Sequence, residues 1–203
     1  MNSDPKIQKK SGYHHGDLRA QLIEATRQLV EEKGPDHFSV SQACRVAGVS
    51  TAAPYRHFRN KEEMLESVCE EAAERHFTQM KAALEGLPDG DLERIIAMGR
   101  VYVGFAQAEP SVFRLMFSWP HQSGAQAPGE DAAPPPTKTL VETEVAKLLG
   151  RTEIDSDVKL RATMLWTFVH GLSFLLIDGK AKVCEFDSDI EEMLSEAARR
   201  VMA

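Results

Sequence analysis

The chain has 203 residues, 42% of them hydrophobic, so it is long and apolar enough to bury a core, which excludes an intrinsically disordered protein. The net charge of −7 is unevenly spread, since residues 1–61 carry ten Lys and Arg against six Asp and Glu, whereas residues 62–203 carry fourteen against twenty-five. A basic N-terminal part on an acidic body is typical of a protein that meets nucleic acid at one end, although uneven surface charge alone gives the same counts.

Helices are predicted throughout, because no segment shows the strict alternation of apolar and polar residues that a half-buried strand requires. Residues 1–13 form a basic polar tail that we expect to be flexible. The first predicted helix covers about residues 15–33 and ends at Gly34-Pro35, a capping glycine followed by a helix-breaking proline. One face of this helix is apolar and is expected to meet a core: Leu18, Leu22, Ala25 and Leu29.

Residues 39–61 are the most informative segment, because they predict a short helix, a tight turn and a second short helix. Ser39 and Gln42 have the spacing of a capping box, in which two side chains satisfy backbone donors at the start of a helix. Gly48 stands where the chain turns sharply, and Ser50 is expected to cap the second helix. Small residues permit close approach of the two helices: Ala43, Cys44 and Ala47. This layout is typical of a helix-turn-helix DNA-binding unit.

Pro54 conflicts with a regular second helix. It lies four residues after the expected cap, where it removes a backbone donor and crowds the carbonyl of Ser50. The neighbouring Ala52 and Ala53 offer no long polar side chains. We therefore expect modest direct reading of base edges and more reliance on DNA shape and phosphates.

The remaining sequence predicts one long helix and five further helices. Asn60 is expected to cap the long helix, residues 61–85. The apolar face of this helix comprises Met64, Leu65, Val68, Ala72 and Met80. The next four helices cover about residues 91–108, 110–117, 137–149 and 155–178. A last amphipathic helix follows the capping-box pair Ser188 and Glu191. Residues 118–136 hold five of the ten prolines and predict a mobile loop.

We expect an all-α protein with a helix-turn-helix domain at residues 14–62 and a helical bundle at residues 63–203. The helix at residues 155–178 is apolar nearly all round, which predicts burial on both sides. One side can meet the subunit's own core and the other a partner subunit, although a central helix in a monomer explains the pattern as well. Gly171 and Ser173 would permit close approach of two backbones. The expected dimer interface comprises Leu165, Val169, Leu172, Leu176, Ile190, Met193, Leu194, Ala197 and Val201.

The stretch from Ala47 to Glu62, with Gly48, Tyr55, His57 and Asn60-Lys61 at its fixed positions, closely resembles the signature of the TetR/AcrR family of bacterial transcription regulators. The likeness spans about residues 14–66. The segment Tyr13-His14-His15-Gly16-Asp17-Leu18 looks like one branch of that family, and Trp166 with His170-Gly171 resembles the Trp/His-Gly motif of the same branch. The resemblance implies an all-α homodimer whose three N-terminal helices bind a palindromic DNA operator. It also implies that the C-terminal helices dimerise and bind a small effector.

Carried over by position, the resemblance implies a DNA-contacting set. Tyr55 and His57 match positions that touch phosphate and base edges, although both side chains could instead pack against the first helix. Lys61 matches a phosphate-contacting lysine at the start of a helix. The full set is Ser39, Ser41, Gln42, Ser50, Thr51, Ala52, Tyr55, Arg56, His57 and Lys61.

The candidate effector pocket rests on apolar and aromatic residues of the helices expected to face inward, a composition that also describes an ordinary core. They are Met98, Tyr102, Phe105, Phe113, Met116, Phe117, Trp119, Met164, Trp166, Phe168 and His170. Trp166 and His170 stand one turn apart and either line the cavity or form an aromatic–imidazole pair in the core. The composition favours a lipophilic or aromatic effector.

The three cysteines, Cys44, Cys69 and Cys184, are scattered and form no CxxC pair, which argues against a disulfide framework or structural zinc. Cys44 is expected to be an inert packed thiol. The N-terminal residues contain no apolar segment of a signal peptide. The apolar run 162–177 is shorter than the roughly 20 residues of a membrane span, so we expect a buried helix in a cytoplasmic protein.

No catalytic constellation is apparent, because the chain lacks a GxSxG elbow, a phosphate-binding loop and an HExxH pair. His14, His15 and Asp17 do not predict a metal site, since adjacent histidines on a helix point apart. We therefore expect no enzyme activity, no cofactor and no metal. The leading hypothesis is a ligand-responsive repressor. The alternatives are a helical small-molecule-binding protein without specific DNA binding and an uncharacterised enzyme.

Overall fold

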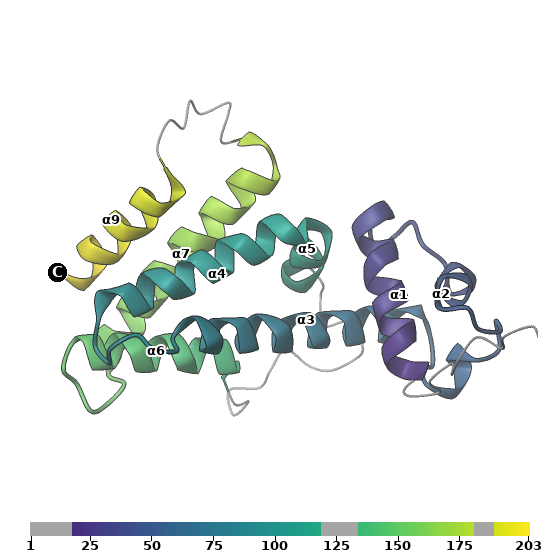
Figure 1. The fold of residues 1–203 in the computed structure, drawn as a ribbon, viewed down its shortest axis with the longest axis horizontal. Helices are drawn as coiled ribbons and strands as arrows, with labels where there is room; N and C mark the ends of the chain where they lie inside the picture. Colours follow the sequence, from purple (N-terminus) through teal and green to yellow (C-terminus); the bar gives the residue numbers. More distant parts are fainter. Residues whose placement is uncertain (1–17, 119–133, 181–188) are drawn as a thin grey trace, which may run out of the picture.

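The computed structural model describes residues 18–118, 134–180 and 189–203, and every regular element in this part of the chain is a helix (Figure 1). The predicted all-α class is confirmed. The elements in chain order are α1 (Leu18–Lys33), α2 (Val40–Ala47), the 3-10 turn η1 (Pro54–Arg56), α3 (Lys61–Ala83), α4 (Leu92–Ala108), α5 (Pro110–Ser118), α6 (Pro136–Leu148), α7 (Ser156–Ile177) and α9 (Ile190–Met202).

The molecule consists of a small head and a larger body joined by one continuous helix. The head contains α1, α2 and η1, the body contains α4, α5, α6, α7 and α9, and α3 runs from one into the other (Figure 1). In the body, α4 packs against α3, α7 and α9, and α6 packs against α7. The head has its own buried residues on three elements: Leu22, Ile23 and Val30 of α1, Ala43 and Cys44 of α2, and Leu65 of α3.

Local capping signals place several helix ends where the sequence predicts them. The Ser39 hydroxyl accepts the Gln42 backbone N–H at 3.3 Å, and the Gln42 side chain accepts the Ser39 backbone N–H at 2.9 Å, so the capping box is confirmed. Gly48 ends α2 with a φ of 70°, a left-handed conformation that a residue without Cβ adopts at little cost. The Asn60 side chain accepts the Glu63 N–H at 2.9 Å and caps α3.

The predicted second helix of the helix-turn-helix unit is wrong in its extent, because only Pro54–Arg56 is helical and it forms a 3-10 turn. Proline has no N–H to bond to the Ser50 carbonyl, so the helical segment begins at Pro54 instead of running through it. The backbone bonds span three residues, with the Ala53 N–H on the Ser50 carbonyl at 3.0 Å and the His57 N–H on the Pro54 carbonyl at 2.8 Å. The expectation that Ser50 caps a helix is wrong, since η1 has no side-chain cap.

Helix α7 is buried on one side only, which corrects the expectation of burial on both. Val158, Ala162, Leu165, Leu172 and Ser173 are buried. On other faces Leu160, Met164 and Trp166 are 59%, 48% and 47% exposed. The reason is that α4, α6 and α9 cover one side of α7. With 22 residues, α7 closely matches the expected helix at residues 155–178. By length and composition alone it could cross a membrane, and 28% of its most apolar stretch is buried within the described structure.

The last helix begins with a different cap from the expected one. Asp189 precedes α9, and its carboxylate accepts the Glu191 backbone N–H at 3.1 Å. Ser188, the basic tail at residues 1–13, Trp119 and Cys184 lie outside the described residues, as does most of the predicted loop at residues 118–136. Because α6 starts at Pro136, the loop ends before that residue.

A buried ion pair fixes the end of the body farthest from the head. The Arg94 guanidinium of α4 donates to the Glu144 carboxylate of α6, and the two side chains are 10% and 3% exposed. Arg94 also donates to the backbone carbonyls of Leu84 and Leu87, at 3.1 and 2.8 Å. One guanidinium therefore holds the α3–α4 connection and α6 together.

Candidate DNA interface and ligand cavity

The η1 turn presents its polar side chains to solvent while two buried residues anchor it. Pro54 is buried and Phe58 is 3% exposed, whereas Tyr55 between them is 67% exposed. Arg56 and His57 are also exposed. The interpretation in which Tyr55 and His57 pack against α1 is therefore wrong. An aromatic hydroxyl, a guanidinium and an imidazole stand free on a turn whose backbone is held by apolar packing.

The other predicted DNA-contacting residues fall into two groups. Exposed residues are Ser39, Ser41, Ser50, Thr51 and Ala52. Gln42 and Lys61 are half-buried and already engaged. The Gln42 oxygen is used in the capping box, so it is not free to accept from a base. The Lys61 Nζ lies 4.5 Å from the centroid of the Phe38 ring and donates to the Asp36 carbonyl at 3.4 Å.

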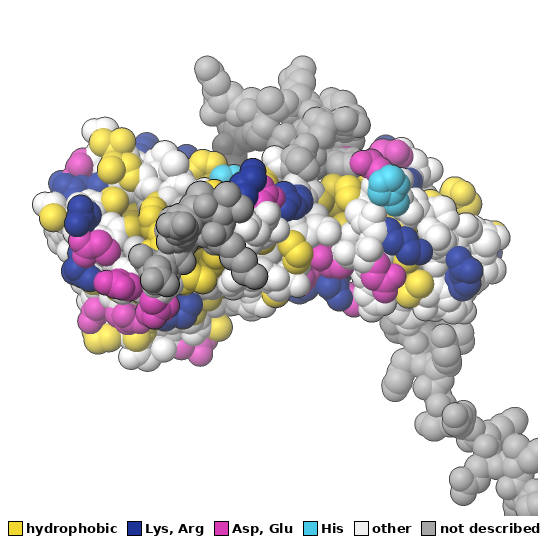
Figure 2. All heavy atoms as spheres, turned by 90° about the horizontal axis from the view of Figure 1, so that it is seen from above, with side chains coloured by type: hydrophobic (Ala, Val, Ile, Leu, Met, Phe, Trp, Pro, Cys, Tyr) yellow, Lys and Arg dark blue, Asp and Glu magenta, His cyan; other side chains and the backbone are white. Residues whose placement is uncertain are grey.

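Two exposed arginines of the head were missed by the sequence reasoning. Arg45 lies one helical turn after Ser41 on α2, and that i, i+4 spacing was a signal that could have found it. Arg59 precedes α3 with 81% of its side chain exposed and pairs with Glu63 at 3.0 Å. Figure 2 shows Lys and Arg side chains and a histidine on the head with Asp and Glu among them, and Asp and Glu beside Lys and Arg at the opposite end of the body. Both signs of charge are therefore exposed on this face of the head.

The body contains a cavity of about 520 Å³. Its walls come from α3, α4, α5, α6, α7 and α9 and are mostly apolar. Of the predicted pocket residues, six line it: Met98, Tyr102, Met116, Phe117, Trp166 and Phe168. Phe105, Phe113 and His170 do not line it, and Met164 is exposed on the outside of α7. The helices were identified correctly, but the face of α7 was only partly correct.

Four residues predicted for the dimer interface line this cavity instead: Leu165, Val169, Leu194 and Ala197. Leu165, Leu172 and Leu194 are buried within the single chain, so a partner subunit cannot contact them in this arrangement. The remaining predicted interface residues are half-buried and pack against the core: Leu176, Ile190, Met193 and Val201. For Leu165, Leu172 and Leu194 the expectation is wrong, because periodicity identifies an apolar face without telling what covers it. For the half-buried residues it stays a prediction. A Cβ on Gly99 would lie 3.1 Å from the Leu194 side chain, which shows how closely α4 and α9 approach.

Behind the cavity wall, aromatic rings surround His170. Its Nδ1 lies 2.9 Å from the Tyr102 hydroxyl, and its ring centroid lies 5.0 Å from that of Trp166. Burial lowers the pKa of His170 and raises that of Tyr102, so both groups are uncharged near neutral pH. Both interpretations of the Trp166–His170 pair are therefore partly right. Trp166 lines the cavity, whereas His170 does not line it and packs against the Trp166 ring from behind the wall.

Two buried polar residues of the lining were missed by the sequence reasoning. His76 is 5% exposed and lines the cavity from α3. The signal was present, because Ala72 and Met80 of the apolar face of α3 are eight positions apart, and His76 lies midway between them. Glu142 of α6 also lines the cavity and is 5% exposed. Burial lowers the pKa of His76 to about 4, so the imidazole is neutral near pH 7.

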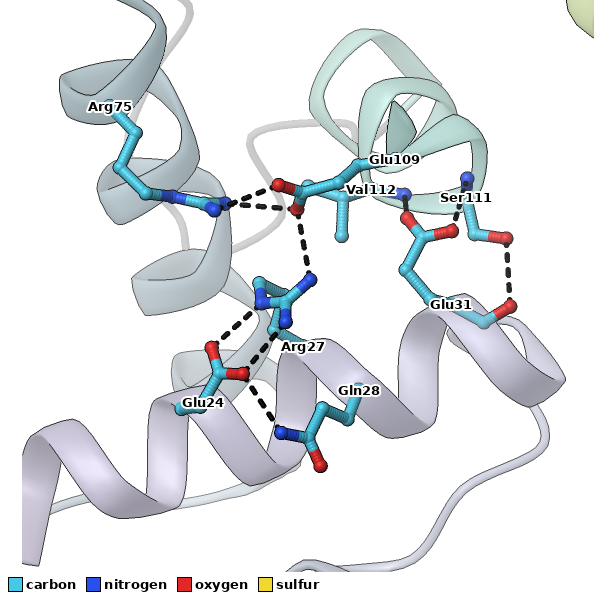
Figure 3. A network of polar contacts seen from close by, with 8 residues as sticks. All are labelled: Glu24, Arg27, Gln28, Glu31, Arg75, Glu109, Ser111 and Val112. Carbon is cyan, nitrogen blue, oxygen red and sulfur yellow. Dashed lines mark hydrogen bonds and ion pairs between the residues drawn. The ribbon is translucent and has the colours of Figure 1, made fainter. Parts of the chain in front are cut away.

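A polar network joins the head to the body (Figure 3). The Glu109 carboxylate, between α4 and α5, accepts two bonds from Arg75 of α3 at 2.8 and 2.9 Å and one from Arg27 of α1 at 3.3 Å. Arg27 in turn bonds to Glu24 at 2.7 Å, and this contact holds the pKa of Glu24 well below its usual range, at about 2.

A second contact of the network reaches the start of α5. The Glu31 carboxylate of α1 accepts the backbone N–H groups of Ser111 and Val112 at 3.2 and 2.6 Å (Figure 3). These donors have no partner within a helix, so the carboxylate acts as a cap supplied from the head. The opposite end of α5 carries Met116 and Phe117, which line the cavity. One short helix therefore contacts both the head and the cavity.

These features define a helical protein with a basic head that exposes a turn and a body that encloses an apolar cavity. The chain belongs to the TetR family: the model for tetracyclin repressor-like C-terminal domains matches residues 95–201, and that for bacterial regulatory proteins of the tetR family matches residues 22–68. The likeness at residues 14–66 is thereby confirmed at the level of the family.

Similar proteins are found both by sequence and by fold. The nucleoid occlusion factor SlmA of Marinomonas sp. (strain MWYL1) is 30% identical over 100 residues, which are 49% of this chain and 50% of that protein. The chain spans about half the length of this relative and of two SlmA proteins of Aliivibrio fischeri that it also matches. A solved protein of unknown function from Rhodococcus sp. RHA1 has a TM-score of 0.73 at 28% identity and covers 94% of this chain and 96% of its own. A TetR-family transcriptional regulator from Streptomyces coelicolor has a TM-score of 0.60 at 18% identity, with 90% and 96% covered, and shows the same fold.

Proposed function

We propose that this protein is a DNA-binding transcriptional regulator that binds a palindromic operator as a homodimer and responds to a small lipophilic or aromatic effector. The observation that carries the proposal is the η1 turn, where Tyr55 is 67% exposed on a backbone anchored by buried Pro54 and Phe58. A large aromatic side chain left in water on a basic head serves no packing purpose. Family membership supports the same conclusion.

The protein would recognise its operator mainly through contacts with phosphates and through the shape of the DNA. The exposed residues before η1 are short, with Thr51 and Ala52 as examples. The longer exposed side chains, Arg45, Tyr55 and Arg56, reach farther from the backbone and suit phosphate oxygens and groove edges. We therefore assign DNA contact to η1, to the start of α2 and to Arg45.

The exposed apolar face of α7 is the proposed dimer surface. Leu160 and Met164 are 59% and 48% exposed and lie one turn apart. Gly171 continues the stripe, and a Cβ at this position would meet nothing within 4 Å in the single chain. Exposed apolar side chains in a row mark an interaction surface, and a second copy would cover them in a symmetric pair. Two heads would then enter successive major grooves, about 34–36 Å apart.

The response to an effector would pass through α5. A ligand that displaces Met116 or Phe117 at one end of α5 would disturb the contacts of Glu109 and Glu31 with α1 at the other end. The separation of the two heads would change with the angle of α1 and α3 relative to the body. The effector alters DNA affinity only to the extent that it binds the two arrangements with different affinity.

The direct test is binding of the full-length protein to DNA from its own gene region, compared with random DNA, over a range of salt concentrations. Specific binding should weaken steeply with salt, because several phosphates are neutralised. Light scattering in parallel should show a dimer that Met164→Glu dissociates and Ile154→Glu, an exposed control outside α7, does not. A monomeric wild-type protein without preference for any fragment would overturn the proposal.

A second candidate is a helical small-molecule-binding protein without specific DNA binding. The observation that favours it is the reduction of the second helix of the DNA-binding unit to a three-residue 3-10 turn. Equal affinity for genomic and random DNA, together with ligand binding in the body, would select this candidate.

A further inference from the structure

The charged residues that line the cavity form one ion pair. Lys138 and Glu142 of α6 are the charged residues among its lining, and the Lys138 Nζ lies 3.8 Å from the Glu142 carboxylate. The Glu142 side chain is 7% exposed and that of Lys138 is 57% exposed, so the pair lies where the cavity approaches the surface. A charged ligand would have to compete with this pair for either partner. The lining of described residues therefore offers no unpaired charge.

Two hydroxyl groups of the wall are already occupied. The Tyr102 hydroxyl bonds to His170 Nδ1 at 2.9 Å, and the Thr163 hydroxyl donates to the Lys159 backbone carbonyl at 2.7 Å. Neither needs a ligand to satisfy it.

His76 differs from these groups. Its ring packs against Tyr102 and Phe105, with centroids 5.2 and 5.1 Å apart, and its Nε2 is buried without a hydrogen-bond partner in the described part of the chain. Native proteins satisfy the large majority of buried polar side-chain atoms, so an unsatisfied one requires an explanation. A bound ligand can supply the missing partner, because His76 is itself part of the cavity wall.

We propose that the cavity binds an uncharged aromatic molecule with one hydroxyl group, a phenol or an aromatic alcohol, and that this hydroxyl pairs with His76 Nε2. The proposal deepens the proposed function, because such a molecule would be the effector. A neutral imidazole presents a donor or an acceptor at Nε2 according to its tautomer, and a hydroxyl can meet either. Tyr102, Phe117, Trp166 and Phe168 line the same space and suit an aromatic ring.

The cavity can adapt to such a molecule. Its volume of about 520 Å³ is within the range of small-ligand sites. Because Nε2 is covered by neighbouring side chains, the hydroxyl reaches it only after a local rearrangement. Met80, Met98 and Met116 line the cavity, and methionine has three rotatable bonds and fills irregular spaces.

The test measures binding of four matched probes to the full-length protein without DNA, by equilibrium dialysis. The probes are 4-hydroxybiphenyl, its near-isostere 4-methylbiphenyl, biphenyl-4-carboxylate and 4-(aminomethyl)biphenyl. The expected result is that the ratio of hydroxyl to methyl affinity falls by about tenfold in His76→Phe, which corresponds to one hydrogen bond. In the control Thr163→Val, which removes a hydroxyl that is already paired, the ratio stays at the wild-type value.

Several outcomes would overturn the inference. One is an unchanged hydroxyl-to-methyl ratio in His76→Phe. Another is tightest binding of the carboxylate with dependence on Lys138, tested by Lys138→Gln, or of the amine with dependence on Glu142, tested by Glu142→Gln. If His76→Phe does not fold, nuclear magnetic resonance of wild-type His76 decides, since its Nε2 signal should shift with 4-hydroxybiphenyl and not with 4-methylbiphenyl.

The outcomes for this site and for the proposed function are separable. Hydroxyl-dependent binding through His76 without any change in DNA affinity would support the site and contradict the effector response. Specific, salt-dependent DNA binding by a dimer that discriminates none of the four probes would support DNA binding and contradict the site.

Discussion

The head and the body differ in what they expose and what they enclose. Both have helix ends fixed by local caps, such as Ser39 with Gln42 in the head and Asp155 with Val158 in the body. Contacts between distant residues tie the head to the body through Arg27 and Glu109, and join the helices of the body to one another through Arg94 and Glu144. The head exposes the polar side chains of its η1 turn, whereas the body buries an imidazole nitrogen that has no hydrogen-bond partner among the described residues. The difference teaches that the head presents a surface, while the body keeps an internal space.

The most severe way to break the body is to remove one partner of its buried ion pair. Glu144→Ala leaves the buried Arg94 guanidinium with two backbone carbonyls and the exposed Asp89 carboxylate, 3.5 Å away, and we expect the free energy of unfolding to fall by about 3 kcal/mol. Urea denaturation measures this loss. As a control, Glu196→Ala removes an exposed partner of Arg199 and Arg200 and should leave the denaturation midpoint nearly unchanged. Equal midpoints for the two variants would show that the body does not depend on the distant pair.

The second prediction concerns the pH dependence of stability that the buried His76 imidazole of the body causes. His76 has a pKa near 4 in the folded protein against about 6.5 unfolded, so the unfolded chain binds the proton more readily. The free energy of unfolding should therefore fall below pH 6.5 by about 1.4 kcal/mol per pH unit, reaching about 3 kcal/mol at pH 4. His76→Phe should lose this component and keep the smaller one of His170, whose pKa is also lowered by burial. Identical pH profiles for the two proteins would contradict the assignment.

The third prediction weakens the head through a local signal. Ser39→Ala removes the hydroxyl that caps α2, and we expect a loss of about 1 kcal/mol in the free energy of unfolding. Ser50→Ala is the matched control, because Ser50 is an exposed serine of the head whose hydroxyl caps no helix, whereas the Ser41 hydroxyl contacts that of Ser39 at 3.0 Å. Thermal unfolding of both variants checks the difference, and a larger effect from Ser50→Ala would refute the role of the cap.

The fourth prediction concerns Tyr55→Ala, for which we expect the smallest effect on stability and the largest effect on DNA binding. Tyr55 is 67% exposed, so Tyr55→Ala should change the free energy of unfolding by less than about 0.5 kcal/mol. DNA affinity should fall by about tenfold, the order of one lost contact. A mobility-shift assay with melting curves in parallel separates the two effects. Unchanged affinity would remove Tyr55 from the proposed interface.

The success of the sequence analysis followed the same division between head and body. The cap at Ser39, the left-handed Gly48 and the start of α3 at Asn60 were predicted, because each depends on a few adjacent residues. The second helix of the head was predicted too long, although the warning from Pro54 was itself local. In the body the helices were predicted nearly to their ends, but the partner of each face was not. Leu165 and Leu194 were therefore assigned to a dimer interface and instead line the cavity.

By itself, the sequence determined the all-helical class, the helix boundaries set by caps, glycines and prolines, and the likeness of the head to one family, because these depend on neighbouring residues. Only the tertiary structure decided which face of α7 is covered, that α5 joins the head to the cavity, and that His76 Nε2 has no hydrogen-bond partner among the described residues. The physical reason is that a periodic pattern marks a face as apolar, whereas burial, pairing and empty space depend on which distant element packs against that face.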